Sequence, residues 1–309
     1  MVFTTVNGAF DELLKRIELN PDRVQKVAGR YKSVKETLEA GIPGCEVFQI
    51  GSFQRKTKIR PDDENEGLDI DVGVCIKEFT EYASGGVIPS QALVKVDTAI
   101  SENNNYAKMN LKKDMPTVAL KYADGFLIEF VPCYKSVGRH YHRDSPPYCY
   151  IVGKDGSSWQ PADYVYDATI ISGLNQVPAV KQLLVPSIKM IKRYIRNLNL
   201  SLKSFHVEML CALIIPNLIA DWTNRNLRFG FHHILAFFLS GVYAFMQDSV
   251  SIPGSYSPAV DSGLSQLKLI ELGLVLKRKG DNALKICEMT DEGEALGNWR
   301  IFFGEPFPA

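Results

Sequence analysis

Residues 50–74 read "IGSFQRKTKIRPDDENEGLDIDVGV". An apolar run ends at Gly51-Ser52, a long polar stretch follows, and Asp69 and Asp71 lie two positions apart in a second apolar run. In a strand, residues i and i+2 point to the same face, so these two carboxylates project together. At about 4–5 Å apart they repel by about 3–4 kcal/mol at an effective dielectric constant of about 20. Such a pair persists when it is solvated, protonated or bound to a cation.

A third carboxylate favours cation binding over the other two explanations of the Asp pair, solvation and protonation. Glu129 lies alone among apolar residues in "LIEFV" (127–131), on a strand that could lie beside the first. Magnesium prefers oxygen ligands and usually combines one or two carboxylates with substrate phosphates. Three carboxylates on neighbouring strands could hold two divalent ions, which activate a hydroxyl and neutralise a leaving pyrophosphate. The sequence therefore predicts a metal site at Asp69, Asp71 and Glu129 for Mg²⁺, with Mn²⁺ as the second choice.

The Gly51-Ser52 pair predicts a phosphate site. It ends a predicted strand, and the polar residues after it can begin a helix. Glycine lets backbone approach phosphate, and the serine hydroxyl and nearby N–H groups can bind the β- and γ-phosphates. Arg55, Lys56 and Lys58 follow closely and could add charge-assisted contacts. Asp-x-Asp or Gly-Ser alone usually marks a turn, but their order, with each motif at a strand, is specific.

The chain divides near residue 165 into an α/β half, 1–165, and a helical half, 166–309. Apolar runs predict strands in the first half, and "DG" predicts a hairpin between the third and fourth of them: 45–50, 68–76, 117–123, 126–134 and 148–152. Helical periodicity covers 9–40 and 90–104. The longest apolar helical segments of the second half are 177–198, 204–220, 229–247 and 261–275.

Composition excludes several classes of protein. Lys plus Arg equals Asp plus Glu at 35 each, whereas a protein that grips long nucleic acid is usually more basic. The six cysteines form no Cys-x-x-Cys pair and indicate free thiols in a reducing cytoplasm. Residues 229–247 carry no formal charge but contain two His, and we expect a buried helix there and not a membrane span. We therefore expect a cytoplasmic protein that does not associate with a membrane.

The constellation of Gly-Ser, Asp-x-Asp on a strand and a later acid resembles the DNA-polymerase-β-like nucleotidyltransferase superfamily. The stretch "SIKMIKRYIRNLNLSLKSFHVEML" (187–210) resembles the helical segment of oligoadenylate synthases and cyclic GMP-AMP synthase. The ending "GNWRIFFGEPFP" (297–308) resembles that of the bacterial CD-NTases of anti-phage CBASS operons. The resemblance covers about 45–308. It implies a mixed-sheet nucleotidyltransferase core and a C-terminal helical lobe, with the active-site cleft between them.

The resemblance also implies roles for the three acids. Asp69 and Asp71 would bind both metal ions, and Glu129 would complete one metal site and help to deprotonate the acceptor hydroxyl. Glu129 stands where many relatives have Asp, and it remains a carboxylate.

Six further residues would bind nucleotide. Ser52, in its turn with Gly51, would hold the triphosphate, and Ser204 would contact it from the helical lobe. Lys192, with Lys189 as a second candidate, would neutralise phosphate. Phe205 would stack on a base, and it stands at a common Tyr, so it lacks the phenolic hydrogen bond. The departures from the family pattern at Glu129 and Phe205 bear on base preference more than on catalysis.

The implied function is the joining of NTPs into a cyclic di- or trinucleotide, with release of pyrophosphate. The product would activate an effector in anti-phage signalling, and regulatory CBASS proteins are the implied partners. Two alternatives stay open: transfer to an RNA end or a small molecule such as an antibiotic, and a retired fold that only binds nucleotide or a partner. The sequence leaves open the bases, linkage, ring size, activating signal, oligomeric state and any conjugation through Ala309.

Overall fold

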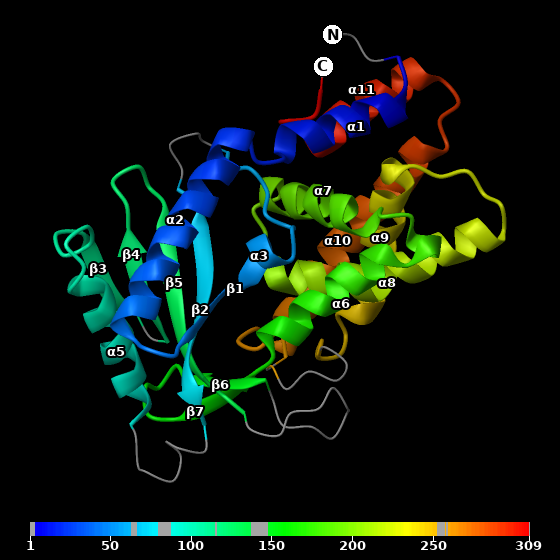
Figure 1. Cartoon of the computed structure of the whole chain (residues 1–309). Helices are drawn as coiled ribbons and strands as arrows, with labels where there is room; N and C mark the ends of the chain where they lie inside the picture. Colours follow the sequence, from blue (N-terminus) through cyan, green and yellow to red (C-terminus); the bar gives the residue numbers. More distant parts are fainter. Residues whose placement is uncertain are drawn as a thin grey trace.

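A mixed β-sheet forms the centre of the first half of the chain (Figure 1). The computed structural model describes residues 4–62, 67–79, 88–114, 116–136, 148–251, 257 and 259–308. Residues 63–66 of the polar stretch between Ser52 and Asp69, and Ala309, lie outside these ranges. The main path of the sheet runs β1-β2-β5-β4-β3, and β6 pairs with β5 and β7. The strands are β1 (Glu46–Gln49), β2 (Asp69–Glu78), β3 (Asn110–Asp114), β4 (Thr117–Lys121), β5 (Leu127–Lys135), β6 (Cys149–Val152) and β7 (Trp159–Ala162).

The strand predictions are confirmed, and the predicted hairpin joins β4 to β5. Strands β3 and β7 were not among them. Only β2 and β5 pair in parallel, and every other pair of described strands is antiparallel. This one parallel pair sets the register of the predicted carboxylates.

One face of the sheet is covered by α2 (Pro21–Gly41) and α5 (Pro89–Ser101) (Figure 1). Because side chains alternate along a strand, the apolar residues between and after the aspartates of β2, Ile70, Val72 and Val74, all enter this core. Asp69 and Asp71 therefore lie on the opposite face, away from α2 and α5.

The helical stretch predicted over 9–40 consists of two helices, α1 (Val6–Ile17) and α2. Asn20 begins α2 by accepting a hydrogen bond from the Arg23 N–H at 2.8 Å, and Pro21 takes the first helical position. From the sequence, the whole helical stretch 9–40 is predicted to belong to the α/β half with the sheet. In the structure, α2 packs on the sheet, whereas Phe10 and Leu13 of α1 lie in the core of the second half.

The second half of the chain is a bundle of helices, called the helical lobe below (Figure 1). It comprises α6 (Tyr164–Gln176), the short 3₁₀ helix η1 (Pro178–Val180), α7 (Leu184–Asn197), α8 (Ser204–Asn224), α9 (Phe231–Phe245), α10 (Gln266–Cys287) and α11 (Glu292–Phe303). The segment predicted over 177–198 thus begins as η1, and its α-helix starts only at Leu184.

The apolar stretch 229–247 forms α9, a helix largely buried in the core, as predicted. Among the described helices, only α8 is long and apolar enough to cross a membrane by length and composition. More than half of its apolar window is buried inside the protein, as expected of a core helix. All six cysteines are free thiols, and five of them are buried.

The contact between α9 and α10 is very close at Gly280. A Cβ added there would lie 2.1 Å from the Ser240 backbone nitrogen and 2.5 Å from the Leu239 carbonyl carbon. Backbone atoms cannot yield as the end of a flexible side chain can. The two helices can therefore pack at this distance only because residue 280 has no side chain.

We expect Gly280→Ala to lower the free energy of unfolding by about 2 kcal/mol, because it overpacks this contact. The matched control is Gly297→Ala in α11, where an added Cβ meets nothing within 4 Å. That substitution should stabilise the helix by about 0.5–1 kcal/mol. Urea unfolding of both variants measures the difference, and equal midpoints would contradict the packing argument.

Candidate functional site

The three predicted acids meet at one end of the parallel strand pair. Asp71 of β2 lies directly opposite Glu129 of β5, and Asp69 lies opposite Leu127. Residues paired across neighbouring strands point to the same face at a strand spacing of about 4.8 Å. Asp69 is exposed, and Asp71 and Glu129 are partly buried. The neighbouring strands that the sequence predicted for these carboxylates are therefore confirmed.

The predicted phosphate turn packs directly against Asp71. Gly51 begins α3 (Gly51–Gln54) with a φ of +68°, in the left-handed region that glycine favours. A Cβ on Gly51 would lie 1.9 Å from Asp71 Oδ2. The Ile50 N–H donates to the Asp71 carbonyl oxygen at 3.1 Å. Glycine is thus required at position 51 both for the backbone angle and for room beside the carboxylate.

Asp71 lies in a field of mixed charges. Burial raises its pKa, the cations of Lys58 and Arg55 lower it, and the anions of Asp69 and Glu208 raise it again. The net effect is a raised pKa. Lys58 also donates to the Asp69 carbonyl oxygen at 3.1 Å. Ionised Asp71 is therefore under-compensated in the protein alone, which is the state that a bound cation would relieve.

The donor set fits a hard divalent ion, because it consists of carboxylate oxygens on rigid strands. Within the ranges that the structure describes, no three His, Cys, Asp or Glu side chains are already arranged to hold a metal ion. The metal site at Asp69, Asp71 and Glu129 stays a prediction.

A buried carboxylate on α8 gathers the cations around the phosphate turn. Glu208 Oε2 lies 2.6 Å from Arg55 Nε, and Glu208 Oε1 lies 2.7 Å from Lys192 Nζ. Lys192 also donates to the Thr57 carbonyl oxygen at 2.9 Å. Burial alone would raise the pKa of Glu208, but Lys192 and Arg55 lower it below its usual value. Glu208 is therefore ionised, and it neutralises one of the two cations.

The helical-lobe residues predicted to bind nucleotide are only partly gathered. The Phe205 ring lies over the Arg55 guanidinium at 4.5 Å from its centroid. Ser204, exposed at the start of α8, and Lys192 line one pocket of about 170 Å³. Lys189 instead pairs with Glu18 at 2.6 Å. The structure thus places Phe205, Ser204 and Lys192 around the segment that follows Gly51-Ser52, whereas Lys189 is engaged by the residue that follows α1.

Glu208 has no role predicted from the sequence. The signal was present, since the acid stands among His206, Val207, Met209 and Leu210 in an apolar stretch. Such a residue is almost never fully buried unless it is paired. Its partners could not be identified, because Arg55 is 153 positions away.

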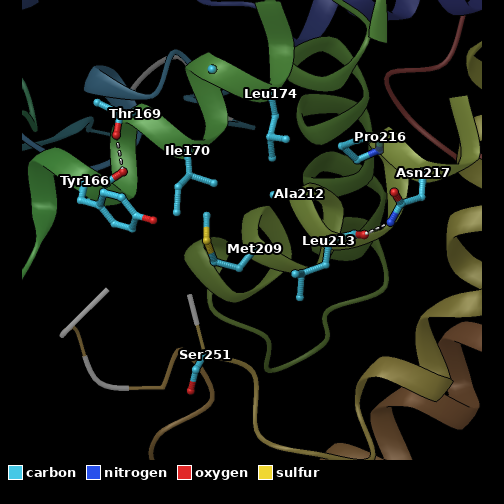
Figure 2. A pocket seen from close by; sticks show the side chains of 11 residues that line it. Tyr166, Thr169, Ile170, Leu174, Met209, Ala212, Leu213, Pro216, Asn217 and Ser251 are labelled. Carbon is cyan, nitrogen blue, oxygen red and sulfur yellow. Dashed lines mark hydrogen bonds between the residues drawn. The ribbon is translucent and has the colours of Figure 1, made fainter. Parts of the chain in front are cut away.

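The largest pocket described is apolar and lies between α6 and α8 (Figure 2). It has a volume of about 610 Å³, and Ile170, Leu174, Met209 and Pro216 point into it. None of the described residues that line it is charged. This lining offers no cationic partner to a triphosphate, whereas Arg55, Lys58 and Lys192 lie near α3, where the sequence predicts the phosphate site.

The raised pKa of Asp71 gives a pH-dependent stability. Because folding favours its protonated form, the contribution of Asp71 to stability is lost as pH rises through the folded-state pKa. We therefore expect Asp71→Asn to be more stable than the wild type at neutral pH without metal. The difference should vanish below the unfolded Asp pKa of about 3.9. Thermal unfolding from acid to neutral pH, with the exposed Asp221→Asn of α8 as the control, measures it; a variant less stable at neutral pH would contradict this account.

Comparison with known proteins agrees with this fold. Residues 4–147 match the family described as the Second Messenger Oligonucleotide or Dinucleotide Synthetase domain, SMODS. No curated protein sequence matches the chain significantly.

Several solved structures have the same fold over nearly the whole length. CdnC of E. coli MS115-1, solved with ATP, has a TM-score of 0.70 at 14% identity, with 98% of this chain and 99% of that chain covered. CdnG of Bradyrhizobium diazoefficiens, solved with GTP, has a TM-score of 0.69 at 14% identity, with 97% and 95% covered. DncV of Vibrio cholerae, a cyclic AMP-GMP synthase solved with the linear intermediate pppA(3′,5′)pG, has a TM-score of 0.69 at 11% identity, with 99% and 97% covered.

These findings confirm the resemblance inferred from the motifs. The family match includes the Gly51-Ser52 turn and all three acids, and the structural matches extend through the helical lobe. Residues 4–147 are therefore similar to the Second Messenger Oligonucleotide or Dinucleotide Synthetase family, and the whole chain has the fold of the bacterial CD-NTases.

Proposed function

We propose that this chain joins NTPs into a cyclic di- or trinucleotide second messenger, with release of pyrophosphate. The observation that carries the proposal is the packing of the Gly51-Ser52 turn against Asp71, with Glu129 in register on the next strand. In this geometry, the turn that is proposed to bind phosphate lies beside carboxylates on one face of the sheet. The structures of CdnC with ATP, CdnG with GTP and DncV with a linear dinucleotide support a cleft that accepts nucleotides.

Asp69, Asp71 and Glu129 would hold Mg²⁺, with Mn²⁺ as the alternative ion. When bound, such ions lower the pKa of an attacking hydroxyl and neutralise charge on the leaving pyrophosphate. The protein contributes position, because β2 and β5 fix the carboxylates. Glu129 would complete one metal site and help to deprotonate the acceptor ribose hydroxyl. Catalysis of this kind rests mainly on alignment and charge neutralisation.

The nucleotide would lie between α3 and the helical lobe. Gly51 and Ser52 would bind the β- and γ-phosphates, with Ser204 on the lobe side. The Arg55 guanidinium lies over the Phe205 ring. A nucleotide base that stacks on Phe205 would add a third layer to this contact. Such stacking tolerates every base.

The proposal includes a cytoplasmic location and a role in anti-phage signalling through a separate effector that binds the product. Six free thiols suit a reducing compartment. CdnC was also solved in complex with a HORMA protein, at a TM-score of 0.71, 14% identity and 99% coverage of both chains. A regulatory protein partner of this chain is therefore part of the proposal.

The first test uses Asp69→Asn with Asp71→Asn. We expect the wild type, with Mg²⁺ or Mn²⁺ and all four NTPs, to form a phosphatase-resistant product that is lost by a factor of about 10³ or more in the double variant. The assay supplies each NTP α-³²P-labelled in turn and separates the products after phosphatase treatment. Asp221→Asn is the control for loss of a carboxylate. Incorporation of label into an added RNA or a small acceptor, without a cyclic product, would favour the alternative acceptors.

The second test concerns Phe205. Phe205→Ala should raise the KM for the stacked nucleotide by about tenfold or more, since a base–aromatic stack contributes about 1–3 kcal/mol. Phe205→Tyr keeps the ring and should leave KM near that of the wild type, with base preference as the property that changes. Initial rates with each NTP pair measure both. An unchanged KM in Phe205→Ala would remove Phe205 from the nucleotide site.

A further inference from the structure

Three of the six cysteines lie together on one face of the sheet. Cys75 of β2 is paired directly with Cys133 of β5, and Cys149 comes from β6, which pairs with β5 on its other side. All three are buried in the same small apolar core on this face. Cys133 is thus the centre of a row of three thiols that crosses three neighbouring strands.

The thiols of this row are in contact. Cys133 shares one hydrogen bond with Cys75 and another with Cys149. Neighbouring strands are about 4.8 Å apart, and Cα atoms joined by a disulfide are about 4.4–6.8 Å apart. Because Cys75 and Cys133 are paired residues of neighbouring strands, their backbones already have the spacing that a disulfide requires.

Cys75 has the surroundings of a reactive thiol. The Cys133 S–H donates to it and lowers its pKa, and the backbone N–H and ammonium of Lys135 add to this effect against burial and the anion of Glu46. A lower pKa increases the share of thiolate, which is the nucleophilic form. The Cys75 thiol also contacts the Lys77 carbonyl oxygen at 3.8 Å, where the register of β2 and β5 shifts.

The other three cysteines lie elsewhere in the fold. Cys45 is in the core beneath α2 and α5, and Cys211 and Cys287 are in the helical lobe. Burial raises the pKa of Cys45 to about 11 and that of Cys287 to about 12. Cys287 is nevertheless the most exposed of the six, whereas Cys75 is only 3% exposed. Exposure and proximity therefore favour different cysteines.

We propose that Cys75, Cys133 and Cys149 form a peroxide-sensitive modification site, in which hydrogen peroxide converts Cys75 and Cys133 into a disulfide across β2 and β5. The Cys75 thiolate attacks one peroxide oxygen, the O–O bond breaks, and the hydroxide that leaves takes up a proton to form water. The Cys133 sulfur then attacks the sulfenic acid, the S–O bond breaks, and the oxygen leaves with the thiol proton as a second water. The two thiols lose two electrons, which the peroxide gains. Cys149 is the alternative partner of Cys133.

The disulfide would lie on the face of the sheet that carries the acids. Cys75 comes four residues after Asp71, and Cys133 comes four residues after Glu129, so the four side chains share one face. The Cβ atoms of a disulfide are about 3.8 Å apart, which is less than the strand spacing of about 4.8 Å. The bond therefore draws β2 and β5 together on this face. We expect it to slow product formation, an effect that rests on the proposed function.

The test exposes the full-length wild type to hydrogen peroxide, blocks the remaining thiols with N-ethylmaleimide in urea, and maps disulfides by mass spectrometry without reduction. We expect the Cys75–Cys133 bond to exceed any bond to Cys45, Cys211 or Cys287 by about tenfold or more, because neighbouring groups react at a high effective concentration. Dithiothreitol should reverse it. A Cys133 that stays reduced while Cys287 is oxidised would show that exposure controls the reaction, and it would overturn the proposal.

Two comparisons show whether the fold directs this bond. In Cys133→Ala, Cys75 and Cys149 should both stay reduced, because two strand spacings, about 9–10 Å, exceed the reach of a disulfide. Cys211→Ala, which removes a buried thiol of the lobe, is the matched control and should cross-link like the wild type. In wild type oxidised in denaturing urea, the preference for Cys75–Cys133 should disappear. A bond between Cys75 and Cys149 in Cys133→Ala, or the same preference in urea, would contradict the assignment, and the wild-type arms decide it even where a variant does not fold.

Product formation is the third measurement. The oxidised wild type should form the cyclic product about fivefold or more slowly than the reduced protein, since small displacements of reacting groups are costly. Dithiothreitol should restore the rate, and Cys133→Ala should be insensitive to peroxide. A cross-linked protein of unchanged activity would refute the effect on the acids. A reduced wild type without product would instead question the proposed function, and the disulfide map would still decide whether the three thiols form the site.

Discussion

The parallel pairing of β2 with β5 is the constraint on which the site depends. It sets Asp71 opposite Glu129 and leaves Asp69 on the same face, two residues nearer the start of the strand. The same alternation sends Ile70 and Val72 into the core beneath α2 and α5. The hydrophobic contacts that fix the strand therefore also aim the carboxylates, and a slip of one residue would exchange the two sets.

Close approach of the backbone completes this arrangement. Gly51 occupies the space beside Asp71 Oδ2 where any side chain would collide. The chain then turns through α3 and returns to the Ser52 carbonyl at Thr57. The Gly51-Ser52 turn and the acidic end of β2 are thus held together by backbone geometry alone.

Buried charge joins this core to the helical lobe. The lobe is largely a hydrophobic bundle, and apolar packing alone is tolerant of small shifts in side-chain position. The Arg55–Glu208–Lys192 group fixes the relative position of the two parts more narrowly, because hydrogen bonds between ions allow only small ranges of length and angle. The lobe therefore holds the segment that follows Gly51-Ser52 through Glu208 and Lys192.

The sequence by itself determined the strands that carry the acids, the helical nature of the second half and the turn at Gly51-Ser52, because each depends on local patterns of polarity and backbone freedom. The position of Glu129 beside Asp71 was inferred from the isolated acid in an apolar run, and β2–β5 pairing confirmed it.

Only the tertiary structure decided the partners of the basic residues. Lys192 meets Thr57 across 135 positions, Lys189 meets Glu18 across 171, and Arg55 meets Glu208 across 153. It also decided that α1 packs on the helical lobe, whereas α2 packs on the sheet. A cation in a sequence shows only that it needs an anion or solvent, and the fold selects which of the many acids comes within reach.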